Sequence, residues 1–369
     1  MSELAGRHRG MEISREQVLR FRVHVQQLDR EPGDALTAPD VLDLGVQDTG
    51  PDGARWALEL RGHTAHPGDL FTAWTLRGAP HVYRRAQAMA VAAAVAPFSE
   101  ADAAKRIFTA ARPLKQAGIP VLDALDRIAT EMRSIVTSPT AKGDLSSELH
   151  ARLPEPFQRY CQVCDAVHLY EQPFRFSALR AGLELRPGTS PPILERIPGW
   201  HDQAREVDPV LHPIRVALHL LGPLSPKQVA SYIDALVKDI TANWPDDVET
   251  VTIEGEQRQV LSADVDALLS PPDPAGLVRL LGPFDPFLQA RDRELVVPDQ
   301  AHRKDLWRTL GRPGGVLVGQ EVLGSWRPRA AGKKLRVAVN AWAPLPDLTE
   351  QAERLAAFRG VTFDGFVEA

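Results

Sequence analysis

The feature that most restricts how this chain can fold is a helix-start signature that recurs along it. At residues 13–18 a serine is followed three positions later by glutamine, and an apolar residue stands on each side. This is the pattern of a capping box with a hydrophobic staple. It returns at residues 224–229, and variants with aspartate in place of glutamine occur at 36–41 and 98–103. Because 31 prolines interrupt the 369 residues, the chain is predicted to form many short helices with well-defined starts.

The N-terminal part of the chain shows the order of a winged helix-turn-helix module. Apolar residues at helical spacing follow the first signature, a second short helix is expected at 37–44, and a third carries Trp56 and Leu60. A strand-like segment at 70–76 comes next. Three short helices followed by a strand are typical of a winged helix-turn-helix unit, which we place at residues 11–100.

The same order is expected twice more. A second module at residues 101–205 would contain helices at 119–135 and 143–153. The elements expected for a third module, residues 206–285, are helices at 211–221 and 225–240 and strands at 248–253 and 257–261.

After residue 285 the sequence takes on the character of β-structure. Apolar and polar residues alternate between glycines, and Trp326 is expected in the core. The expected elements are strands at 316–319, 321–326, 335–341 and 361–367 and a helix at 348–358. The predicted fold class is therefore α+β, with tandem winged helix-turn-helix modules followed by a small C-terminal antiparallel β-barrel at residues 286–369.

Charge is distributed unevenly along the chain. The net charge of -5 argues by itself against a nucleic-acid partner. However, residues 234–270 hold nine acidic and two basic side chains, whereas residues 301–336 hold nine Lys or Arg and two acidic ones. A clustered basic face is the electrostatic footprint of nucleic-acid binding. The alternative is a solvated pair of strands and a hairpin that are merely basic.

Five residues are predicted to contact DNA. Arg327, Arg329 and Lys333 belong to a basic hairpin, which can follow the minor groove and place arginines near phosphates. Alternatively, the charges protect an exposed strand edge from aggregation. Arg77 and His81 follow the strand of the first module, in a loop suited to phosphate or base contacts. The alternative for His81 is a buried ring bonded to the backbone.

The sequence resembles the AlkZ-type winged-helix DNA glycosylases at both ends. In the N-terminal third the resemblance rests on Leu-Gly-Val-Gln-Asp-Thr at 44–49 and Trp-Thr-Leu-Arg-Gly-Ala-Pro-His at 74–81. In the C-terminal third it rests on Asp-Pro-Phe at 285–287, Arg-Asp-Arg at 291–293, and Gly-Gln-Glu-Val-Leu-Gly-Ser-Trp-Arg at 319–327. The matching segments occur in the same order and cover nearly the whole chain.

This resemblance implies a basic concave channel that holds double-stranded DNA. It also implies hydrolysis of the N-glycosidic bond of alkylated purines, including bulky or crosslinked adducts. The site of such enzymes is a glutamine, an apolar residue, and then glutamine or aspartate. The corresponding positions here are Gln47, Asp48 and Thr49, so the middle residue is charged and the last is a hydroxyl residue.

The chemistry required at Gln47 is modest. A purine alkylated at N3 or N7 is cationic, so the enzyme need mainly hold a water below C1′. In an extended segment Gln47 and Thr49 share one face and can orient this water, while Asp48 points away. Asp48 could serve as a reserve base only if the turn rotated it inward. Alternatively, the segment is an ordinary turn in which Asp48 and Thr49 cap the next helix.

No cofactor or bound metal is expected. Cys161, Cys164 and His168 have half of a zinc-knuckle spacing, but the sequence has no second cysteine pair. A fourth ligand would have to come from His150, His201 or another distant group. The alternative is two buried cysteines in a turn.

We expect a DNA-repair hydrolase, specifically a monofunctional DNA glycosylase acting on alkylated purines in double-stranded DNA. Two alternatives stay open: a non-catalytic winged-helix regulator or damage sensor, and a protein-interaction scaffold. Residues 311–315 lack the Lys-Ser/Thr of a phosphate-binding loop, so a nucleotide-driven motor is not expected. Because residues 1–10 lack the apolar core of a signal peptide and no apolar run is long enough for a bilayer, we expect a cytoplasmic protein without membrane association. A monomer is also expected.

Overall fold

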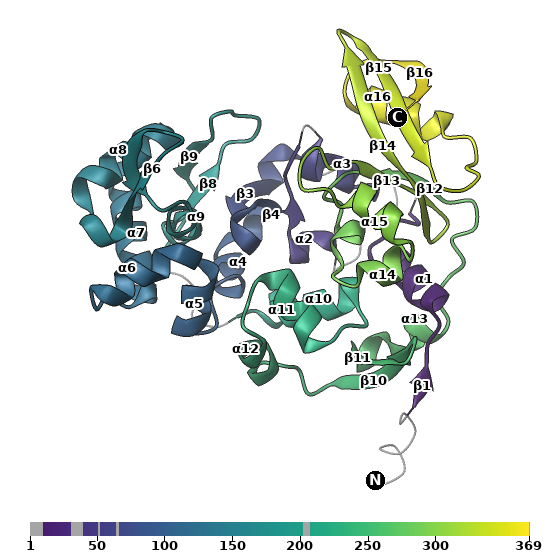
Figure 1. Cartoon of the computed structure of the whole chain (residues 1–369), viewed down its shortest axis with the longest axis horizontal. Coiled ribbons are helices and arrows are strands. Elements are labelled where there is room, and N and C mark those ends of the chain that lie inside the picture. The colour runs from purple at the N-terminus through teal and green to yellow at the C-terminus, as the bar shows by residue number, and fades with distance from the viewer. Residues whose placement is uncertain (1–9, 31–39, 51, 64–65, 202–206, 369) are drawn as a thin grey trace. The chain divides into compact units, whose positions relative to one another are not determined.

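The computed structural model describes residues 10–30, 40–50, 52–63, 66–201 and 207–368. The chain forms two compact units (Figure 1), and each is discontinuous in sequence. Unit 1 comprises Met1–Thr64, Ile214–Tyr232 and Pro245–Ala369. Unit 2 comprises Ala65–Pro213 and Ile233–Trp244. Helices and strands are mixed in both units, which confirms the α+β class.

Unit 1 begins with a short strand and a helix whose start is fixed by its sequence. Strand β1 (Met11–Glu12) leads into helix α1 (Arg15–Val25). The Ser14 side chain accepts a hydrogen bond from the backbone N–H of Gln17, and the Gln17 side chain accepts one from the Ser14 N–H. The predicted capping box is thus confirmed.

The two strands and the first helix expected for the third module are present in the chain. Strand β10 (Val248–Ile253) pairs in parallel with β1 and antiparallel with β11 (Glu256–Leu261). These three strands form one sheet, which Figure 1 shows at one end of unit 1. The accompanying helices are α10 (Pro213–Leu221), α11 (Pro226–Ile233) and α13 (Val265–Leu269).

One predicted helix is broken in two. The sequence predicted a single helix over 225–240, whereas the structure ends α11 at Ile233 and begins α12 (Val237–Ala242) after a gap. Asp234 has a φ of 66°, in the left-handed region that an α-helix cannot include. The chain also passes from unit 1 to unit 2 here, so the third module is divided between the two units.

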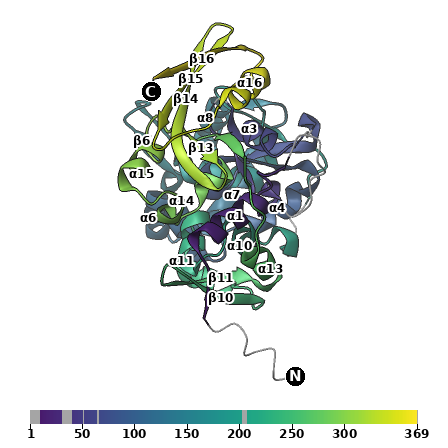
Figure 2. The ribbon, with the colours of Figure 1, turned by 90° about the vertical axis from the view of Figure 1, so that its right-hand side faces the viewer.

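The C-terminal part of unit 1 is a five-stranded sheet covered by helices (Figure 2). The strands, in sheet order, are β12 (Val278–Leu281), β13 (Gly314–Val318), β14 (Glu321–Ala331), β15 (Lys334–Ala341) and β16 (Thr362–Glu368). The helices are α14 (Arg293–Val296), α15 (Gln300–Leu306) and α16 (Thr349–Phe358). Most neighbours are antiparallel, but β15 and β16 are parallel.

The expected antiparallel barrel is therefore wrong for the residues that the structure describes. After β15 the chain returns through α16 before it enters the sheet again, and such a crossover makes the next strand parallel. The sheet runs from β12 at one edge to β16 at the other without closing. Helix α16 packs against both β12 and β16, so the sheet buries its apolar face under a helix.

The N-terminal helices share their core with this C-terminal sheet. Leu19 and Val23 of α1 and Trp56 of α3 (Gly53–Glu59) are buried in one cluster with Leu280 and Val316. The indole N–H of Trp56 donates to the Leu280 carbonyl over 2.7 Å. Residues about 250 positions apart thus form a single hydrophobic core, which is why unit 1 is discontinuous.

Unit 2 contains an antiparallel sheet with the order β4–β3–β8–β9–β5. These strands are β3 (Leu70–Trp74), β4 (Pro80–Arg84), β5 (Thr140–Ala141), β8 (Leu183–Leu185) and β9 (Ile193–Arg196). A separate hairpin consists of β6 (Gln158–Cys161) and β7 (Ala166–Leu169). The helices, besides α12, are α4 (Ala88–Ala94), α5 (Glu100–Arg106), α6 (Ala111–Gln116), α7 (Val121–Ile135), α8 (Lys142–Arg152) and α9 (Glu171–Arg180).

The remaining helix-start signatures have mixed outcomes. Ser225 and Gln228 form a capping box, and the Ser99 side chain accepts from the Asp102 N–H at the start of α5. Thr37 lies outside the described residues, and Asp40 caps α2 (Val41–Leu44). That these elements form tandem winged-helix modules, with boundaries near 100, 205 and 285, stays a prediction.

Candidate active site and nucleic-acid interface

Gln47 and Thr49 lie together in unit 1: Gln47 ends strand β2 (Val46–Gln47), and Thr49 lies between that strand and helix α3. The amide Nε2 of Gln47 donates a hydrogen bond of 3.1 Å to the hydroxyl oxygen of Thr49. Both side chains are half-buried. The structure therefore places these two side chains on one side of the segment, as alternation along an extended backbone predicts.

Asp48 is directed toward the start of α3. Its Oδ1 accepts a hydrogen bond of 3.0 Å from the backbone N–H of Ala54, in the first turn of that helix. A helix leaves its first N–H groups without partners inside the helix, so a carboxylate at this position stabilises the helix start. Asp48 thus has the capping geometry that we gave as the alternative, and its Oδ1 is engaged by the start of the helix.

Gly53 makes this cap possible. Its φ is +45°, and a Cβ atom placed there would lie 2.0 Å from Oδ1 of Asp48. Any larger residue would displace the Asp48 carboxylate and strain the backbone. The Asp48 carboxylate can therefore occupy this position beside the turn only because Gly53 has no side chain.

A pocket of about 260 Å³ brings Thr49 together with the basic hairpin. Thr49 comes from the N-terminal part of unit 1, whereas Arg327 and Arg329 come from β14. The pocket is lined by Thr49, Asp52, Gly53, Gly282, Pro283, Phe284, Gly311, Arg312, Pro313, Gly314, Trp326, Arg327, Pro328 and Arg329. Three sequence-predicted site residues thus meet at one pocket within one unit.

Positive charge is concentrated in this pocket. The Arg312 guanidinium lies 4.9 Å from the ring centroid of Phe284, so it stacks on one wall. Arg327 is 22% exposed and donates to the Gly311 carbonyl, and Arg329 is exposed. Burial, followed by repulsion from Arg308 and Arg329, lowers the pKa of Arg327 from its usual value. Because a guanidinium stays charged in proteins, this crowding favours an anionic ligand such as phosphate.

The acidic residues near the pocket are engaged by neighbouring groups. Asp52 pairs with Arg359, whose Nε lies 2.6 Å from Oδ1. Asp305 accepts hydrogen bonds from Ser325 and Asn340 at its Oδ2. These carboxylates position the walls of the pocket, and their charge is partly neutralised by the contacts they make.

The other residues of the hairpin have different positions. Trp326 borders the pocket but is only 2% exposed, and its indole N–H donates to the Leu281 carbonyl over 2.8 Å, so it belongs to the core as expected. Lys333 is exposed in the turn between β14 and β15. Lys334 and Arg336 both contact Asp364 on β16, and their hydrogen bonds lower the pKa of that carboxyl.

His81 is an interior residue of unit 2. Its ring is 1% exposed, and Nδ1 lies 2.9 Å from the Ala79 carbonyl and 3.1 Å from the Thr75 hydroxyl. Because a carbonyl can only accept, Nδ1 carries the proton, and no described residue offers a partner to Nε2. A ring buried in this way does not reach a DNA phosphate. Arg77, half-exposed with a φ of 58°, remains at the turn that precedes β4.

The buried His81 predicts a stability that decreases in acid. Burial, and then repulsion from Arg77, lower the pKa of His81 from 6.5 to about 3. Below pH 6.5 the unfolded chain takes up a proton that the folded ring excludes, so stability falls as the pH falls toward 3. Between pH 7.5 and 5 this residue should account for a loss of about 2 kcal/mol. Urea unfolding of the wild type and His81→Gln at both pH values tests this, and equal losses would contradict it.

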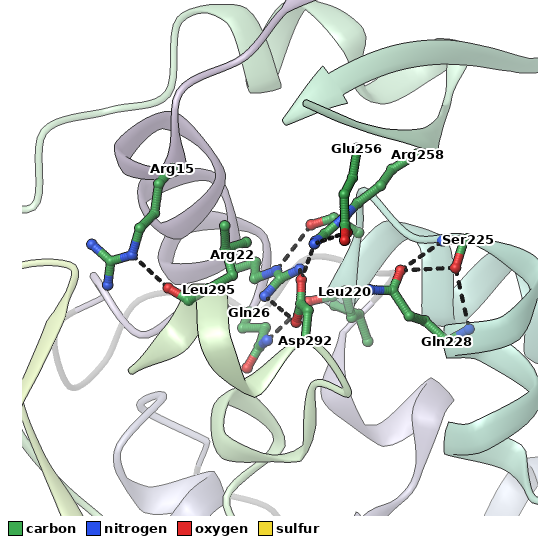
Figure 3. Close-up of polar contacts among 11 residues, drawn as sticks. Arg15, Arg22, Gln26, Leu220, Ser225, Gln228, Glu256, Arg258, Asp292 and Leu295 are labelled. Atoms are coloured by element: carbon green, nitrogen blue, oxygen red, sulfur yellow. Dashed lines mark hydrogen bonds and ion pairs between the residues drawn. The ribbon is translucent and has the colours of Figure 1, made fainter. Parts of the chain in front are cut away.

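The motif carboxylates of the C-terminal third pair with N-terminal arginines inside unit 1. Figure 3 shows Arg22 of α1 bidentate to Asp292, at 3.0 and 2.7 Å, with Arg258 on the same carboxylate. Arg22 is 0% and Asp292 2% exposed. The other pairs are Arg61 with Asp285 and Arg15 with Glu321.

These ion pairs join α1 and the chain just after α3 to the C-terminal segments of unit 1. The sequence motifs at 285–287, 291–293 and 319–327 therefore have a structural role in the described part of the chain. Sequence reasoning did not find it, because a carboxylate in a loop gives no signal of which distant arginine it will contact.

Within the described residues, a search for helices with the length and apolar character of a membrane span finds none.

Known proteins resemble this chain in fold and in sequence family. A search of the curated proteins gives no match. Among solved structures, Streptomyces sahachiroi DNA glycosylase AlkZ matches with a TM-score of 0.70 and 19% identity. The match covers 97% of this chain and 100% of that one, and it shows a shared fold.

The family comparison is more direct. A model of the family described as DNA glycosylase AlkZ-like matches residues 43–358, which is most of the chain. The matched range contains Gln47, Thr49 and the basic hairpin. The chain belongs to the AlkZ-like DNA glycosylase family.

Proposed function

We propose that this protein is a monofunctional DNA glycosylase that hydrolyses the N-glycosidic bond of alkylated purines in double-stranded DNA. One observation carries the proposal. Thr49, hydrogen-bonded to Gln47, lines the same pocket as Arg312, Arg327 and Arg329. The Gln47–Thr49 pair, to which we assign the role of orienting a water, and an arginine cluster thus belong to one unit.

The proposed reaction needs a positioned water more than a strong base. An alkylated purine is a cationic leaving group, so the bond to C1′ breaks with oxocarbenium character. In this proposal the Gln47 amide and the Thr49 hydroxyl orient a water toward C1′ through hydrogen bonds. The water forms the new bond to C1′, the neutral purine departs with the bonding electrons, and the proton passes to solvent.

The arginines have the complementary role of holding the phosphates. Arg327 and Arg329 carry fixed positive charge and can donate several N–H groups to phosphate oxygens. The half-buried Phe284 ring with Arg312 over it supplies an apolar wall beside that charge. We propose that these residues position the duplex, with Arg77 as a further contact from unit 2.

The direct test is a panel of duplex oligonucleotides carrying methylated, bulky or crosslinked purines. Abasic-site formation should appear on at least one of these substrates and be absent on the undamaged duplex. The methylated member tests the smallest lesion, and the others show whether the pocket accepts larger adducts. If the wild type leaves every member intact at high enzyme concentration, the proposal is wrong.

A second candidate is a non-catalytic DNA-binding regulator or damage sensor on the same scaffold. It is favoured by the position of Asp48, because the one carboxylate of the motif caps α3. Sequence-specific binding to undamaged duplex, without base release from any substrate, would support this candidate. Lesion-dependent base release would exclude it.

The arginine cluster predicts a steep dependence of DNA affinity on salt. Each neutralised phosphate of B-DNA contributes about 0.9 to the slope of log affinity against log salt. The double variant Arg327→Ala/Arg329→Ala should therefore bind more weakly, with a slope smaller by about 2. Fluorescence anisotropy with a labelled duplex at several salt concentrations measures both quantities.

Arg336→Ala is the matched control for this prediction. Arg336 is an exposed arginine of the neighbouring strand β15, and it is paired with Asp364. Its removal should leave the slope close to that of the wild type. If the control and the double variant changed the slope equally, the contacts would be general surface charge and not this pocket.

A further inference from the structure

Three potential metal ligands converge on the β6–β7 hairpin of unit 2. Cys161 ends β6, Cys164 lies in the turn, and His168 lies on β7. Their ligand atoms all lie within 4.8 Å of one another. Asp165 has a φ of 49°, and this left-handed residue closes the turn that brings the two thiols together.

The cysteines do not fill the interior. The alternative to a metal site was that both cysteines are buried in a turn. In the structure Cys161 is half-buried and Cys164 is exposed. Both are free thiols in the structure. A packing role for these side chains is therefore wrong, and the ligand atoms are accessible to an ion from solvent.

The distances are close to those of a tetrahedral zinc site. Zinc binds thiolate sulfur at about 2.3 Å and imidazole nitrogen at about 2.0–2.1 Å, so its ligand atoms are separated by about 3.5–3.8 Å. The three ligand atoms of the hairpin lie within 4.8 Å of one another, so a small rotation of the side chains would bring them to the separations of a zinc site. Softer thiolate and imidazole ligands favour zinc over magnesium or calcium.

The orientation of the His168 ring also suits a cation. Nδ1 of His168 lies 2.7 Å from the Leu169 carbonyl, which can only accept, so Nδ1 is the donor and the ring lone pair is on Nε2. A backbone carbonyl that fixes the ring in this way is the usual partner of a metal-binding histidine.

We propose that Cys161, Cys164 and His168 bind one Zn²⁺, with water as the fourth ligand. The site goes beyond the glycosylase function and does not depend on it. The hairpin has only two strands, and its exposed apolar residues include Tyr160 at 59% and Val163 at 95% exposure. Such a hairpin is marginally stable by itself, so the ion would fix a loop that the protein core does not cover.

Metal content and cobalt spectroscopy test the proposal. The full chain, reduced and treated with chelator, is dialysed against Zn²⁺ and then measured by elemental analysis. We expect one equivalent in the wild type and none in Cys161→Ser/Cys164→Ser, with one retained in the control His201→Ala, which changes an exposed histidine outside the cluster. Co²⁺ added to the wild type should give the intense visible bands of a tetrahedral site and a thiolate charge-transfer band.

The outcomes separate this site from its alternatives. Equal zinc in the wild type and the double-serine variant would overturn the proposal, as would cobalt spectra without a thiolate band. A Cys161–Cys164 disulfide that forms in air, with no zinc bound after reduction, would also overturn it. Because the cobalt titration uses only the wild type, a folding defect in the variant cannot hide the result. Loss of glycosylase activity is not a readout here.

Discussion

Replacing Gln47 by alanine should lower the rate of base release from alkylated duplex DNA by about 10²–10³-fold. This is the typical effect of removing one hydrogen-bonding group that orients or stabilises the reacting atoms. The amide that contacts the Thr49 hydroxyl would be absent, so a water at this place would lose one of its two orienting groups. Single-turnover measurement of abasic sites, with enzyme in excess over DNA, reports the chemical step directly.

Asp48→Asn is the matched control for that prediction. The asparagine side chain keeps an oxygen that can accept from the Ala54 N–H, so the start of α3 is preserved while the charge is removed. Because the Asp48 carboxylate caps α3 and has no role in the proposed water-orienting pair, the rate should stay close to that of the wild type. A large loss in Asp48→Asn with none in Gln47→Ala would reverse the proposed assignment.

Asp292→Ala should destabilise unit 1 by about 3–5 kcal/mol. Asp292 accepts from Arg22 and Arg258, and all three side chains are at most 7% exposed. Removing the carboxylate leaves two buried guanidinium groups without their shared anion, and this typically costs several kcal/mol. Urea unfolding, followed by tryptophan fluorescence and by far-UV circular dichroism, measures the loss.

Glu256→Ala provides the comparison for Asp292→Ala. Glu256 also contacts Arg258, at 3.2 Å, but its side chain is 72% exposed. Exposed ion pairs contribute about 0–1 kcal/mol, so this variant should unfold close to the wild type. Equal destabilisation by the two substitutions would show that burial of the Arg22–Asp292 pair has no special importance.

Local elements of the fold could be predicted because their signals lie within a few residues. The capping boxes at Ser14 and Ser225 each depend on two side chains three positions apart, and both are present. The hairpin of β10 and β11 follows from alternation and a glycine turn, and it begins within a residue of the predicted bounds. The break at Asp234 could not be predicted, because the surrounding residues continue the helical pattern.

The candidate site could be predicted only in part. Alternation along the backbone correctly placed Gln47 and Thr49 on one face, since that contact spans two residues. The same reasoning could not show that Thr49 lines a pocket with Arg327, about 280 positions later. His81 was predicted in a contact loop, but its burial depends on how the rest of unit 2 covers β4, which no local pattern records.

Short-range patterns in this chain set the helix starts, the strand segments, the contact between Gln47 and Thr49 and the spacing of Cys161, Cys164 and His168. The three-dimensional fold decided which distant residues meet: the N-terminal helices with the C-terminal sheet, Arg22 with Asp292, and Thr49 with the basic hairpin. It also left the sheet open, since the strand after α16 joined the edge in parallel. The physical reason is that a helix cap or a strand depends on residues close in sequence, which a local pattern records. A buried charge or an apolar face instead needs a partner from another segment, and only the folded chain determines which segment lies against it.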